Sequence, residues 1–459
     1  MTRLADPVDV AERPRALTTL AGWGAHLRSA CELSAPESEA DVGALLDRSG
    51  SIARGLGRSY GDPALNADRQ VLALPKLDRY LAFDDESGLL TCEAGVSLAR
   101  IIEDFAPRGW FPMITPGTKY VTVGGCIAND VHGKAHHAQG SFSVCVEAMR
   151  VLLASGEVVV ASRSEHEDLF WASFGGMGLL GIVLSASIRL RKVETTYFRQ
   201  EAVRVDDLAS MLAALDEYDR KFPYSVAYVD PIAKGARLGA GVLTVGDHAS
   251  LAELPARLAR RPLRVSGKAK VRVPFELPEL SLNPLTIRLL NVVLTQTLAR
   301  GAPYAHYEKF FYPLDAIDSW NRGYGRRGFA QYQFVIPFAD GLARMRELLA
   351  TIVSSGELPF LNVLKRFGRE SGGLLSFPCE GYTFAIDFPI RTSTAALLRR
   401  LDAMVLAAGG RLYLGKDAHL DAATFRAMYP NLERFLRVKA KYDPGTVFVS
   451  DLARRLGLA

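Results

Sequence analysis

The chain has 459 residues, of which 49% are hydrophobic and 23% charged, and its formal net charge is +5. This length and balance suit a globular protein of two or three domains with large cores, and the charge is too small to indicate a nucleic-acid partner. No run of about 18 uncharged apolar residues is present, so we expect no membrane-spanning helix. The first 20 residues lack the continuous apolar stretch of an export signal, so we expect a cytoplasmic protein.

The cysteines are few and widely spaced. Cys31, Cys92, Cys126, Cys145 and Cys379 form no CxxC pair. Neither a zinc ribbon nor a disulfide framework is therefore indicated. Reduced thiols in a cytosolic setting fit this pattern better than a secreted scaffold does.

From residue 42 to residue 190, short apolar runs alternate with glycine-rich turns. Strands and hairpins are predicted at residues 51–57, 71–77, 89–98, 148–162 and 179–193. Helices are predicted at residues 97–109 and 165–176. Many short strands without a regular βαβ repeat indicate an α+β domain rather than a doubly wound sheet.

A second region begins near residue 194. Its aromatic and β-branched runs predict an antiparallel sheet from residues 227–232, 306–314, 330–338, 358–368 and 382–390. Helical patterns at 342–356 and 393–411 separate them, and the second ends in Gly-Gly. Residues 416–448 predict helix, turn, helix and stop, and we expect this tail to pack back on the first domain. The predicted organisation is thus residues 1–193, 194–410, and 411–459 completing the first domain.

Residues 257–300 combine a basic stretch with a proline-interrupted apolar stretch. One interpretation is a mobile loop followed by a core helix. The other is a surface that meets anionic lipid headgroups or a lipid tail, and it predicts peripheral contact with the inner face of the membrane.

Two glycine-rich stretches indicate phosphate binding. The first is "ARGLGRSYGD", residues 53–62, and the second comprises "PGT" at 116–118 and "TVGG" at 122–125. Glycine lets backbone N–H groups approach an anion closely, and successive N–H groups form a concave anion site. Neither GxGxxG nor the P-loop pattern is present. Two such loops predict a pyrophosphate held from both sides, and hence a dinucleotide bound without a Rossmann motif.

Three histidines follow the second loop. His132 and His136 have the i, i+4 spacing of a metal pair, but no glutamate stands where an HExxH motif needs one, and Gly133 interrupts the helix. We therefore expect no metal. His136 and His137 are interpreted as hydrogen-bonded structural residues, and His132 as the histidine that faces a ligand.

Several motifs taken together resemble the vanillyl-alcohol-oxidase superfamily of FAD flavoproteins. They are "GLGRSYGD", "PGTKYVTVGGCIANDVHG", "FWASFGGMGLLGIV", "GGRLYLGKDAH" and "DPGTVFVSDLARRLGL", and the resemblance spans nearly the whole chain. It implies a two-domain α+β fold, in which an FAD domain built from both ends of the chain faces a substrate domain with an antiparallel sheet.

The resemblance also implies which residues bind FAD. They are Ala53, Arg54, Gly55, Leu56, Gly57, Arg58, Ser59, Tyr60, Gly61, Asp62, Pro63, Gly117, Thr122, Val123, Gly124, Gly125, Asn129, Asp130, Val131, His132, Ile182 and Tyr413. It implies non-covalent FAD, because relatives with a covalent flavin often carry histidine in the first loop, where this chain has Arg58.

Within the superfamily, the motifs are similar to those of oxidases that act on a polyprenyl-phospho-pentose. These enzymes oxidise the ribose C2 hydroxyl to a 2-keto sugar, which a separate nicotinamide-dependent reductase converts to the arabinose donor for cell-wall arabinan. The resemblance implies that Lys416 is catalytic, as the base or as a cation stabilising developing negative charge, with His132 and Tyr60 as hydrogen-bonding partners. It places Gln333, Lys365, Thr383, Ala385 and Tyr228 in the substrate pocket, with Lys365 available to a substrate phosphate.

The chain departs from the family pattern on the substrate side. Ala385 stands where cysteine is frequent, Thr383 where asparagine is frequent, and Phe311 where tyrosine is common. These changes leave open a related FAD-dependent oxidase of a soluble polyol, aldonolactone or glycoside. A non-enzymatic module that docks on membranes or a partner is the third alternative. A polyol oxidase would have no use for a lipid-facing segment at 257–300, and a docking module would bind no yellow cofactor.

Overall fold

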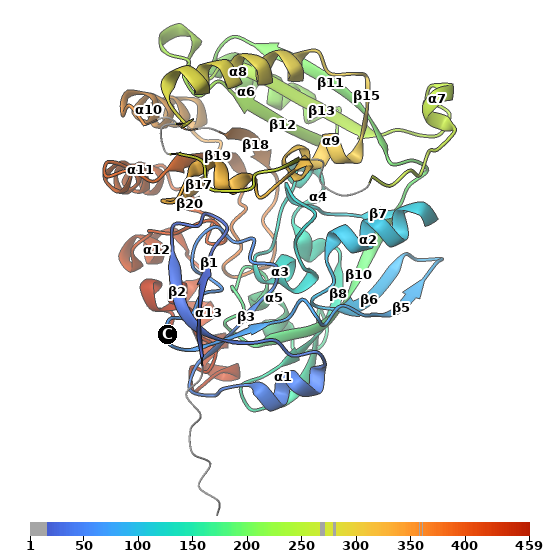
Figure 1. Ribbon diagram of the computed structural model, residues 1–459, viewed down its shortest axis with the longest axis vertical. Coiled ribbons are helices and arrows are strands. Elements are labelled where there is room, and N and C mark those ends of the chain that lie inside the picture. Colours follow the sequence, from blue (N-terminus) through green and yellow to red (C-terminus); the bar gives the residue numbers. More distant parts are fainter. Residues whose placement is uncertain (1–15, 267–270, 279–280, 358, 360) are drawn as a thin grey trace, which may run out of the picture.

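The computed structural model describes residues 16–459 except 267–270, 279–280, 358 and 360, and its elements form two stacked halves (Figure 1). The lower half contains a four-stranded and a six-stranded sheet, and the upper half an eight-stranded sheet. This mixed architecture confirms the predicted α+β class of a two-domain flavoprotein. The domain boundaries at residues 193 and 410 stay predictions.

The two lower sheets come from the first 192 residues. The four-stranded sheet has the order β1 (Leu17–Ala21), β2 (Arg28–Ser34), β4 (Gln70–Ala73) and β3 (Ser51–Arg54). The six-stranded sheet has the order β5 (Tyr80–Asp84), β6 (Leu89–Glu93), β10 (Ile182–Lys192), β8 (Val146–Leu152) and β9 (Val158–Ser162), with β7 (Trp110–Pro112) also paired to β10. Each of the five runs predicted as strands or hairpins in this region contains at least one strand, and the run at 148–162 contains both β8 and β9.

Short helices connect these strands. They are α1 (Glu39–Leu45), α2 (Leu98–Phe105), α3 (Val123–Ala128), α4 (His136–Gln139) and α5 (Glu167–Ser173). Ser97 begins α2 by accepting a hydrogen bond from the backbone N–H of Arg100, and apolar residues three and four apart face the core. The predictions at 97–109 and 165–176 are confirmed.

The eight-stranded sheet is antiparallel throughout. Its order is β15 (Tyr304–His306), β11 (Tyr197–Val205), β13 (Gly241–His248), β12 (Tyr224–Val229), β18 (Asn362–Phe367), β19 (Gly381–Pro389), β17 (Phe329–Ile336) and β20 (Arg411–Leu412). Four of the five predicted strands of this region lie in it. A separate parallel pair joins β14 (Val271–Arg272) to β16 (Ile317–Asp318).

The predicted strand at 306–314 is wrong. Its core is the helix α9 (Tyr307–Phe311), which begins where the His306 side chain accepts a hydrogen bond from the Glu308 backbone N–H. Phe310 stacks on Phe198 with ring centroids 4.6 Å apart, and Phe311 meets the same ring edge-on at 4.8 Å. Adjacent aromatic residues that are both buried fit a short helix as well as a strand, so apolarity alone could not decide between them.

Helices cover the eight-stranded sheet unequally. α6 (Leu208–Tyr218) and α8 (Pro284–Ala299) both contact β11 and β13, while α10 (Gly341–Ser354) and α11 (Thr394–Ala407) contact β17, and α7 (Ala256–Ala259) lies at the rim (Figure 1). α6 packs in the core with Ala227 and Leu243, whereas α8 bonds to Tyr228. Because the consecutive strand residues Ala227 and Tyr228 point to opposite faces of the sheet, α6 and α8 lie on opposite faces. No described helix is both long enough and apolar enough to cross a bilayer.

The C-terminal segment returns to the lower half. Its helices are α12 (Ala422–Met428), α13 (Leu432–Tyr442) and α14 (Asp451–Leu456). Lys439 Nζ donates to the backbone oxygen of Leu179 at 2.9 Å, and Ser29 Oγ in β2 donates to Asp451 at 2.5 Å. In Figure 1 the red tail accordingly lies among the blue strands.

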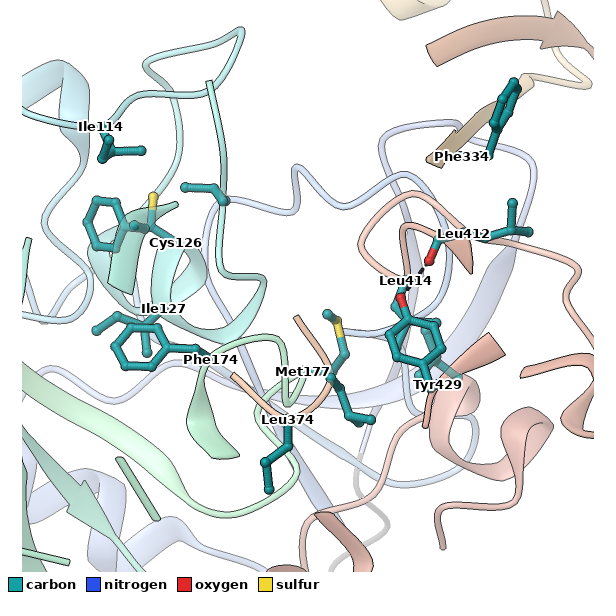
Figure 2. Close-up of a cluster of buried hydrophobic side chains, with 14 of the residues drawn as sticks. Ile114, Cys126, Ile127, Phe174, Met177, Phe334, Leu374, Leu412, Leu414 and Tyr429 are labelled. Atoms are coloured by element: carbon teal, nitrogen blue, oxygen red, sulfur yellow. Dashed lines mark hydrogen bonds between the residues drawn. The ribbon is translucent and has the colours of Figure 1, made fainter. Parts of the chain in front are cut away.

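One hydrophobic core continues across both halves. Figure 2 shows Cys126, Ile127 and Phe174 of the first segment in the same cluster as Leu412 and Tyr429. The Tyr429 hydroxyl donates to the Leu412 backbone oxygen at 2.5 Å, which satisfies a polar group inside this apolar region. All five cysteines are free thiols, as the spacing predicted.

Candidate active site

A cavity of about 1200 Å³ separates the glycine loops from the eight-stranded sheet. Loops of the first 134 residues line one side, and β11, β12, β13 and β18 line the other, with α8 at one end. Gly415 and Lys416, which follow β20, complete the wall between them. The cavity therefore brings together both glycine-rich stretches, His132, Lys416 and part of the 257–300 segment.

The first two loops come into close contact at Gly55, which has no side chain. A Cβ at Gly55 would overlap Thr122 Oγ1, so the two loops approach more closely than any larger residue permits. Gly57 has φ +66°, in the left-handed region that favours glycine. A Cβ at Gly117 would meet nothing within 4 Å, so the backbone there faces open space. Such exposed backbone N–H groups suit the two phosphates of a dinucleotide.

Most of the predicted cofactor residues line the cavity. They are Ala53, Gly55, Leu56, Gly57, Arg58, Ser59, Tyr60, Pro63, Gly117, Thr122, Gly124, Gly125, Asn129, Val131, His132 and Tyr413.

Six predicted cofactor residues lie behind the cavity wall instead. They are Arg54, Gly61, Asp62, Val123, Asp130 and Ile182. Arg54 donates to the backbone oxygens of Ala21 and Ala64 at 2.7 and 3.1 Å, and Asp130 accepts from serines 141, 371 and 376. Gly61 packs against the backbone of residue 417, while Val123 and Ile182 are fully buried. Their contacts fix the loops rather than face a ligand.

Arg58 stacks inside the cavity. Its guanidinium lies 4.0 Å from the centre of the Trp23 ring and 5.6 Å from that of Tyr120. Burial lowers the pKa of Arg58, and its Nε has no hydrogen-bond partner among the residues described. A buried polar atom without a partner in a cavity wall marks a place where a ligand would supply one. Trp23 was not predicted as a site residue.

Lys416 occupies the turn after β20. Its backbone N–H donates to Tyr413 at 2.9 Å, and the Tyr60 N–H donates to Gly415 at 3.1 Å, so the first loop is bonded to the lysine turn. Lys416 Nζ lies 5.5 Å from the centre of the Tyr60 ring. Burial lowers the pKa of Lys416 to about 8, although the carboxylate of Asp387 opposes this.

Asp387 and Gln331 were missed by the sequence analysis. Asp387 is fully buried on β19, where it accepts hydrogen bonds from Gln331 Nε2 and from the Tyr324 hydroxyl at 3.1 Å. Burial raises the pKa of Asp387 to about 6. The one feature that could have identified them is their pairing as polar residues on adjacent strands, and this pairing is unknown until the strand register is known.

His132 is neutral and has one unused ring nitrogen. Gln333 Nε2 donates to His132 Nε2 at 3.0 Å, so that nitrogen accepts and the proton lies on Nδ1. Nδ1 is buried and has no partner in the described part of the chain. Burial, together with the charges of Lys365, His136 and Lys416, lowers the pKa of His132 well below its usual range. The neutral imidazole therefore has an N–H donor that no described residue uses, and His132 lines the cavity.

The predicted substrate residues divide into two groups. Tyr228, Lys365 and Ala385 line the cavity. Gln333 and Thr383 lie behind His132, where Gln333 Nε2 also donates to Thr383 Oγ1 at 3.1 Å and Thr383 donates to the Phe334 backbone oxygen at 2.8 Å. These two residues therefore orient the imidazole rather than contact a substrate directly.

The other two histidines have structural bonds. His136 Nδ1 accepts from the Gly368 backbone N–H at 3.2 Å, and His137 Nε2 lies 3.0 Å from the backbone oxygen of Phe222. Both bonds tie the first half to the second. The structural interpretation of His136 and His137 is confirmed.

α8 forms the end of the cavity and is not a core helix. Its inner side contributes Leu294 and Leu298 to the cavity, and Asn291 accepts a hydrogen bond from Tyr228 at 2.8 Å. Its outer side exposes Leu285 and Leu289, with 77% and 64% of their surfaces accessible. The core-helix interpretation of 257–300 is therefore wrong for α8. Residues 267–270 and 279–280 of this segment lie outside the described residues.

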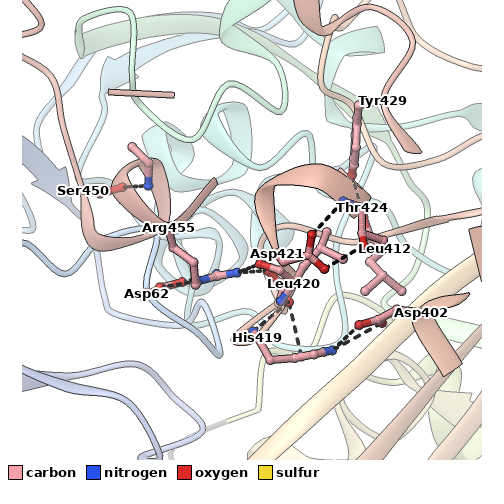
Figure 3. A network of polar contacts seen from close by, with 12 residues as sticks. Asp62, Asp402, Leu412, His419, Leu420, Asp421, Thr424, Tyr429, Ser450 and Arg455 are labelled. Atoms are coloured by element: carbon pink, nitrogen blue, oxygen red, sulfur yellow. Dashed lines mark hydrogen bonds and ion pairs between the residues drawn. The ribbon is translucent and has the colours of Figure 1, made fainter. Parts of the chain in front are cut away.

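A buried ion network supports the loops from below. Figure 3 shows Arg455 of α14 reaching Asp62, and His419 reaching Asp402. Arg455 also bonds Asp417 at 2.8 Å, and His419 lies 3.1 Å from Asp402. Burial lowers the pKa of His419, but the carboxylates of Asp402 and Asp417 outweigh it and raise that pKa above its usual value. This network fixes Asp62, two residues after Tyr60, and Asp417, directly after Lys416.

Comparisons with known proteins agree with this geometry. A family model described as an FAD binding domain matches residues 33–162, which include the glycine loops. A model described as D-arabinono-1,4-lactone oxidase matches residues 326–456, which include β17, β18, β19 and Lys416.

Curated relatives extend the similarity over nearly the full length. Decaprenylphosphoryl-beta-D-ribose oxidase of Mycolicibacterium smegmatis is 38% identical over 97% of this chain and 99% of its own. L-gulono-1,4-lactone dehydrogenase of Mycobacterium tuberculosis is 25% identical over 92% of this chain and 94% of its own. L-gulonolactone oxidase of Bos taurus is 28% identical over 37% of this chain and 38% of its own. With its glycine loops, its cavity and this full-length similarity, the chain belongs to the FAD-binding oxidoreductases of the vanillyl-alcohol-oxidase type.

Proposed function

We propose that this protein oxidises the ribose C2 hydroxyl of decaprenylphosphoryl-β-D-ribose to the 2-keto sugar. This would be the first half of an epimerisation that yields the arabinose donor for cell-wall arabinan. One observation carries the proposal: a single cavity runs from the glycine loops past Lys416 to the apolar inner side of α8. Such a cavity suits a molecule with a sugar at one end and a hydrocarbon chain at the other. The full-length relative that is named for this activity supports the same assignment.

The glycine loops and Tyr413 would hold FAD. Their open backbone, the partnerless Arg58 Nε and the unused His132 Nδ1 fit a ligand rich in phosphate and carbonyl oxygens. When bound, FAD supplies the acceptor for the hydride that leaves ribose C2. We propose that FAD is bound non-covalently, because Arg58 offers no nucleophile at the position where histidine forms the covalent link in relatives.

Lys416 would act as the base. Its Nζ would take the proton of the C2 hydroxyl, and the lowered pKa makes the neutral amine accessible near neutral pH. Asp387 would stabilise the resulting ammonium, because it is a buried carboxylate whose charge acts on Lys416. His132 would donate from Nδ1 to a ligand oxygen, and Tyr60 would limit water access beside Lys416.

α8 would contact the membrane that holds the lipid substrate. Its outer face exposes Leu285, Leu289 and Val293, and Arg288 and Arg300 lie on the same helix or directly after it. Apolar residues flanked by arginine suit an anionic lipid surface. This contact would let the prenyl chain pass from the bilayer to Leu294 and Leu298 inside the cavity. Localisation in the cytoplasm and partnership with a nicotinamide-dependent keto-sugar reductase stay predictions.

A soluble aldonolactone or polyol is the second candidate substrate. The match of residues 326–456 to a lactone oxidase model favours it, and Ala385, Thr383 and Phe311 depart from the first family pattern. The exposed apolar face of α8 argues against it. The FAD binding domain at residues 33–162 stands against the non-enzymatic docking module.

Isotope labelling of the product tests the proposal. The holoenzyme would be mixed without oxygen with one equivalent of a prenyl-phospho-ribose, and the products then reduced with borodeuteride. A ketone at C2 predicts deuterium at C2 of the recovered pentose. Deuterium at C1 or C3, or no deuterium in the recovered pentose, would contradict it.

A further inference from the structure

Four lysines line the cavity, and none of them has an ion-pair partner among the residues described. Lys309 is exposed, whereas Lys134, Lys365 and Lys416 are half-buried. Lys416 has the buried carboxylate of Asp387 to offset its charge, but Lys134 and Lys365 do not. Two half-buried ammonium groups without a neighbouring carboxylate are unfavourable in a protein cavity unless a ligand supplies negative charge.

The two lysines lie close together and come from different halves of the fold. Lys134 follows the glycine loops, and its backbone oxygen accepts from Ser225 in β12 at 3.0 Å. Lys365 lies on β18, which pairs with β12 through Tyr228 and Val363. The charges of Lys134 and Lys416 both act on Lys365, which places it within electrostatic range of both.

No carboxylate of the described residues is among the charges that act on either lysine. Lys134 Nζ donates to the Phe310 backbone oxygen and lies 4.7 Å from the centre of that ring. Lys365 Nζ lies 5.7 Å from the centre of the Phe367 ring and has no hydrogen-bond partner within the described part of the chain. The histidines nearest to Lys365 are His132 and His136, and burial lowers the pKa of both, so they are neutral.

We propose that Lys134 and Lys365 together bind the phosphodiester of a lipid-linked sugar. The identification of the anion as that phosphodiester rests on the proposed function, whereas the binding of an anion does not. A phosphate between these lysines would leave the sugar on the Lys416 side and the hydrocarbon chain on the α8 side of the same cavity. The pair would therefore select charged, lipid-linked pentoses over neutral polyols and lactones.

Bound anion would also change the protonation of the pair. Burial lowers the pKa of Lys134 to about 7 and, together with the charges of Lys416 and Lys134, that of Lys365 to about 7. An anion would raise both values, because an opposite charge favours the ammonium form. Binding above neutral pH should therefore take up protons from the buffer.

Calorimetric titration of the FAD-loaded enzyme tests the proposal. The probes are farnesyl phosphate, farnesol and ribose 5-phosphate, each titrated at pH 8 in two buffers that differ in ionisation enthalpy. Lys134→Met and Lys365→Met keep the side-chain volume and remove the charge, and Lys221→Met, at an exposed lysine at the end of α6, is the matched control. We expect each cavity variant to weaken farnesyl phosphate about ten- to a hundredfold, to abolish proton uptake and to leave farnesol unchanged.

Each contrary result has a distinct meaning. Equal loss of farnesyl phosphate and farnesol would show a packing defect and overturn the proposal. Loss of FAD from the cavity variants would assign the lysines to the cofactor and overturn it too. If ribose 5-phosphate binds as tightly as farnesyl phosphate, the anion that the lysines bind is not specifically that of a lipid-linked sugar, and this part of the proposal is overturned. Tight, lysine-dependent binding of farnesyl phosphate without C2 oxidation would overturn the proposed function and would still support the anion site.

Discussion

Arg455 donates two hydrogen bonds to Asp62, which lies 393 residues earlier in the sequence, with Nη2 2.7 Å from Oδ1 and Nε 3.0 Å from Oδ2. The same guanidinium bonds Asp417, the neighbour of Lys416. The last helix therefore fixes both the first glycine loop and the lysine turn. Asp62, predicted to contact FAD, supports the site from outside the cavity.

Loss of this clamp should reduce both stability and cofactor retention. Arg455→Met would leave two buried carboxylates without their partner, which costs on the order of 3–5 kcal/mol. We expect a lower thermal midpoint and a lower ratio of FAD to protein after gel filtration. Arg426→Met is the control, because its partner Glu433 is exposed. Unchanged FAD content in a destabilised Arg455 variant would show that the clamp does not shape the loops.

Lys416 should set the pH dependence of turnover. As a base it works in the neutral form, so kcat/KM should rise with pH and level off above about 8, the pKa of Lys416. Lys416→Ala should retain FAD and lose turnover. Lys416→Arg decides the role, because arginine stays charged and cannot act as the base. If Lys416→Arg remains active, or if kcat/KM of the wild type falls as the pH rises through 8, Lys416 acts as an electrostatic stabiliser and not as the base.

Gln333 should act through His132. Gln333→Leu removes the donor that holds the proton on Nδ1, so the imidazole would no longer present a fixed donor to the cavity. We expect kcat to fall roughly ten- to a hundredfold with FAD content unchanged. Gln333→Glu would accept from His132 rather than donate, and should move the pH profile as well. An unaltered kcat in Gln333→Leu would show that the hydrogen bond from Gln333 to His132 has no role in turnover.

The outer face of α8 should bind anionic membranes. Leu285→Asp and Leu289→Asp place charge where apolar surface is exposed, and co-sedimentation with phosphatidylglycerol vesicles should be lost. Leu81→Asp is the matched control, since Leu81 is similarly exposed on β5, away from α8. Equal sedimentation of all the variants would show that α8 is not the contact.

The lysine cavity should make the ligand-free protein more stable at higher pH. Lys365 has a folded pKa of about 7 against an ordinary value of 10.5, so between these pH values the unfolded chain binds more protons. Stability therefore rises with pH across this window. Denaturant titrations at pH 7 and pH 9 should show a smaller rise for Lys365→Met than for wild type. A stability that falls between these pH values in wild type but not in the variant would contradict the assignment.

Much of the fold could be predicted from local patterns. Glycine-bounded apolar runs located the strands of the first half, and the Gly-Gly stop after α11 marked a helix end, where Gly409 has φ +71°. The glycine loops indicated a phosphate site because their chemistry lies in consecutive residues. The family resemblance located Lys416, His132 and Lys365, which line the cavity.

The remaining features depend on which residues meet in space. Asp387 and Gln331 face each other only because β17 and β19 pair in one register. Thr383 and Gln333 were assigned to the substrate, but their side chains bond to each other behind His132. α9 was predicted as a strand because Phe310 and Phe311 are both apolar, and only the tertiary packing around Phe198 favours the helix.

Anaerobic bleaching of the flavin is the decisive test of a lipid-linked ribose as the substrate. Absorbance near the flavin bands would be followed while the holoenzyme is mixed with prenyl-phospho-ribose, ribose 5-phosphate, free polyols or aldonolactones. We expect rapid, stoichiometric bleaching by the lipid-linked ribose and slow bleaching, or none, by the others. Rapid bleaching by a free polyol or lactone, with the lipid-linked ribose inert, would contradict it.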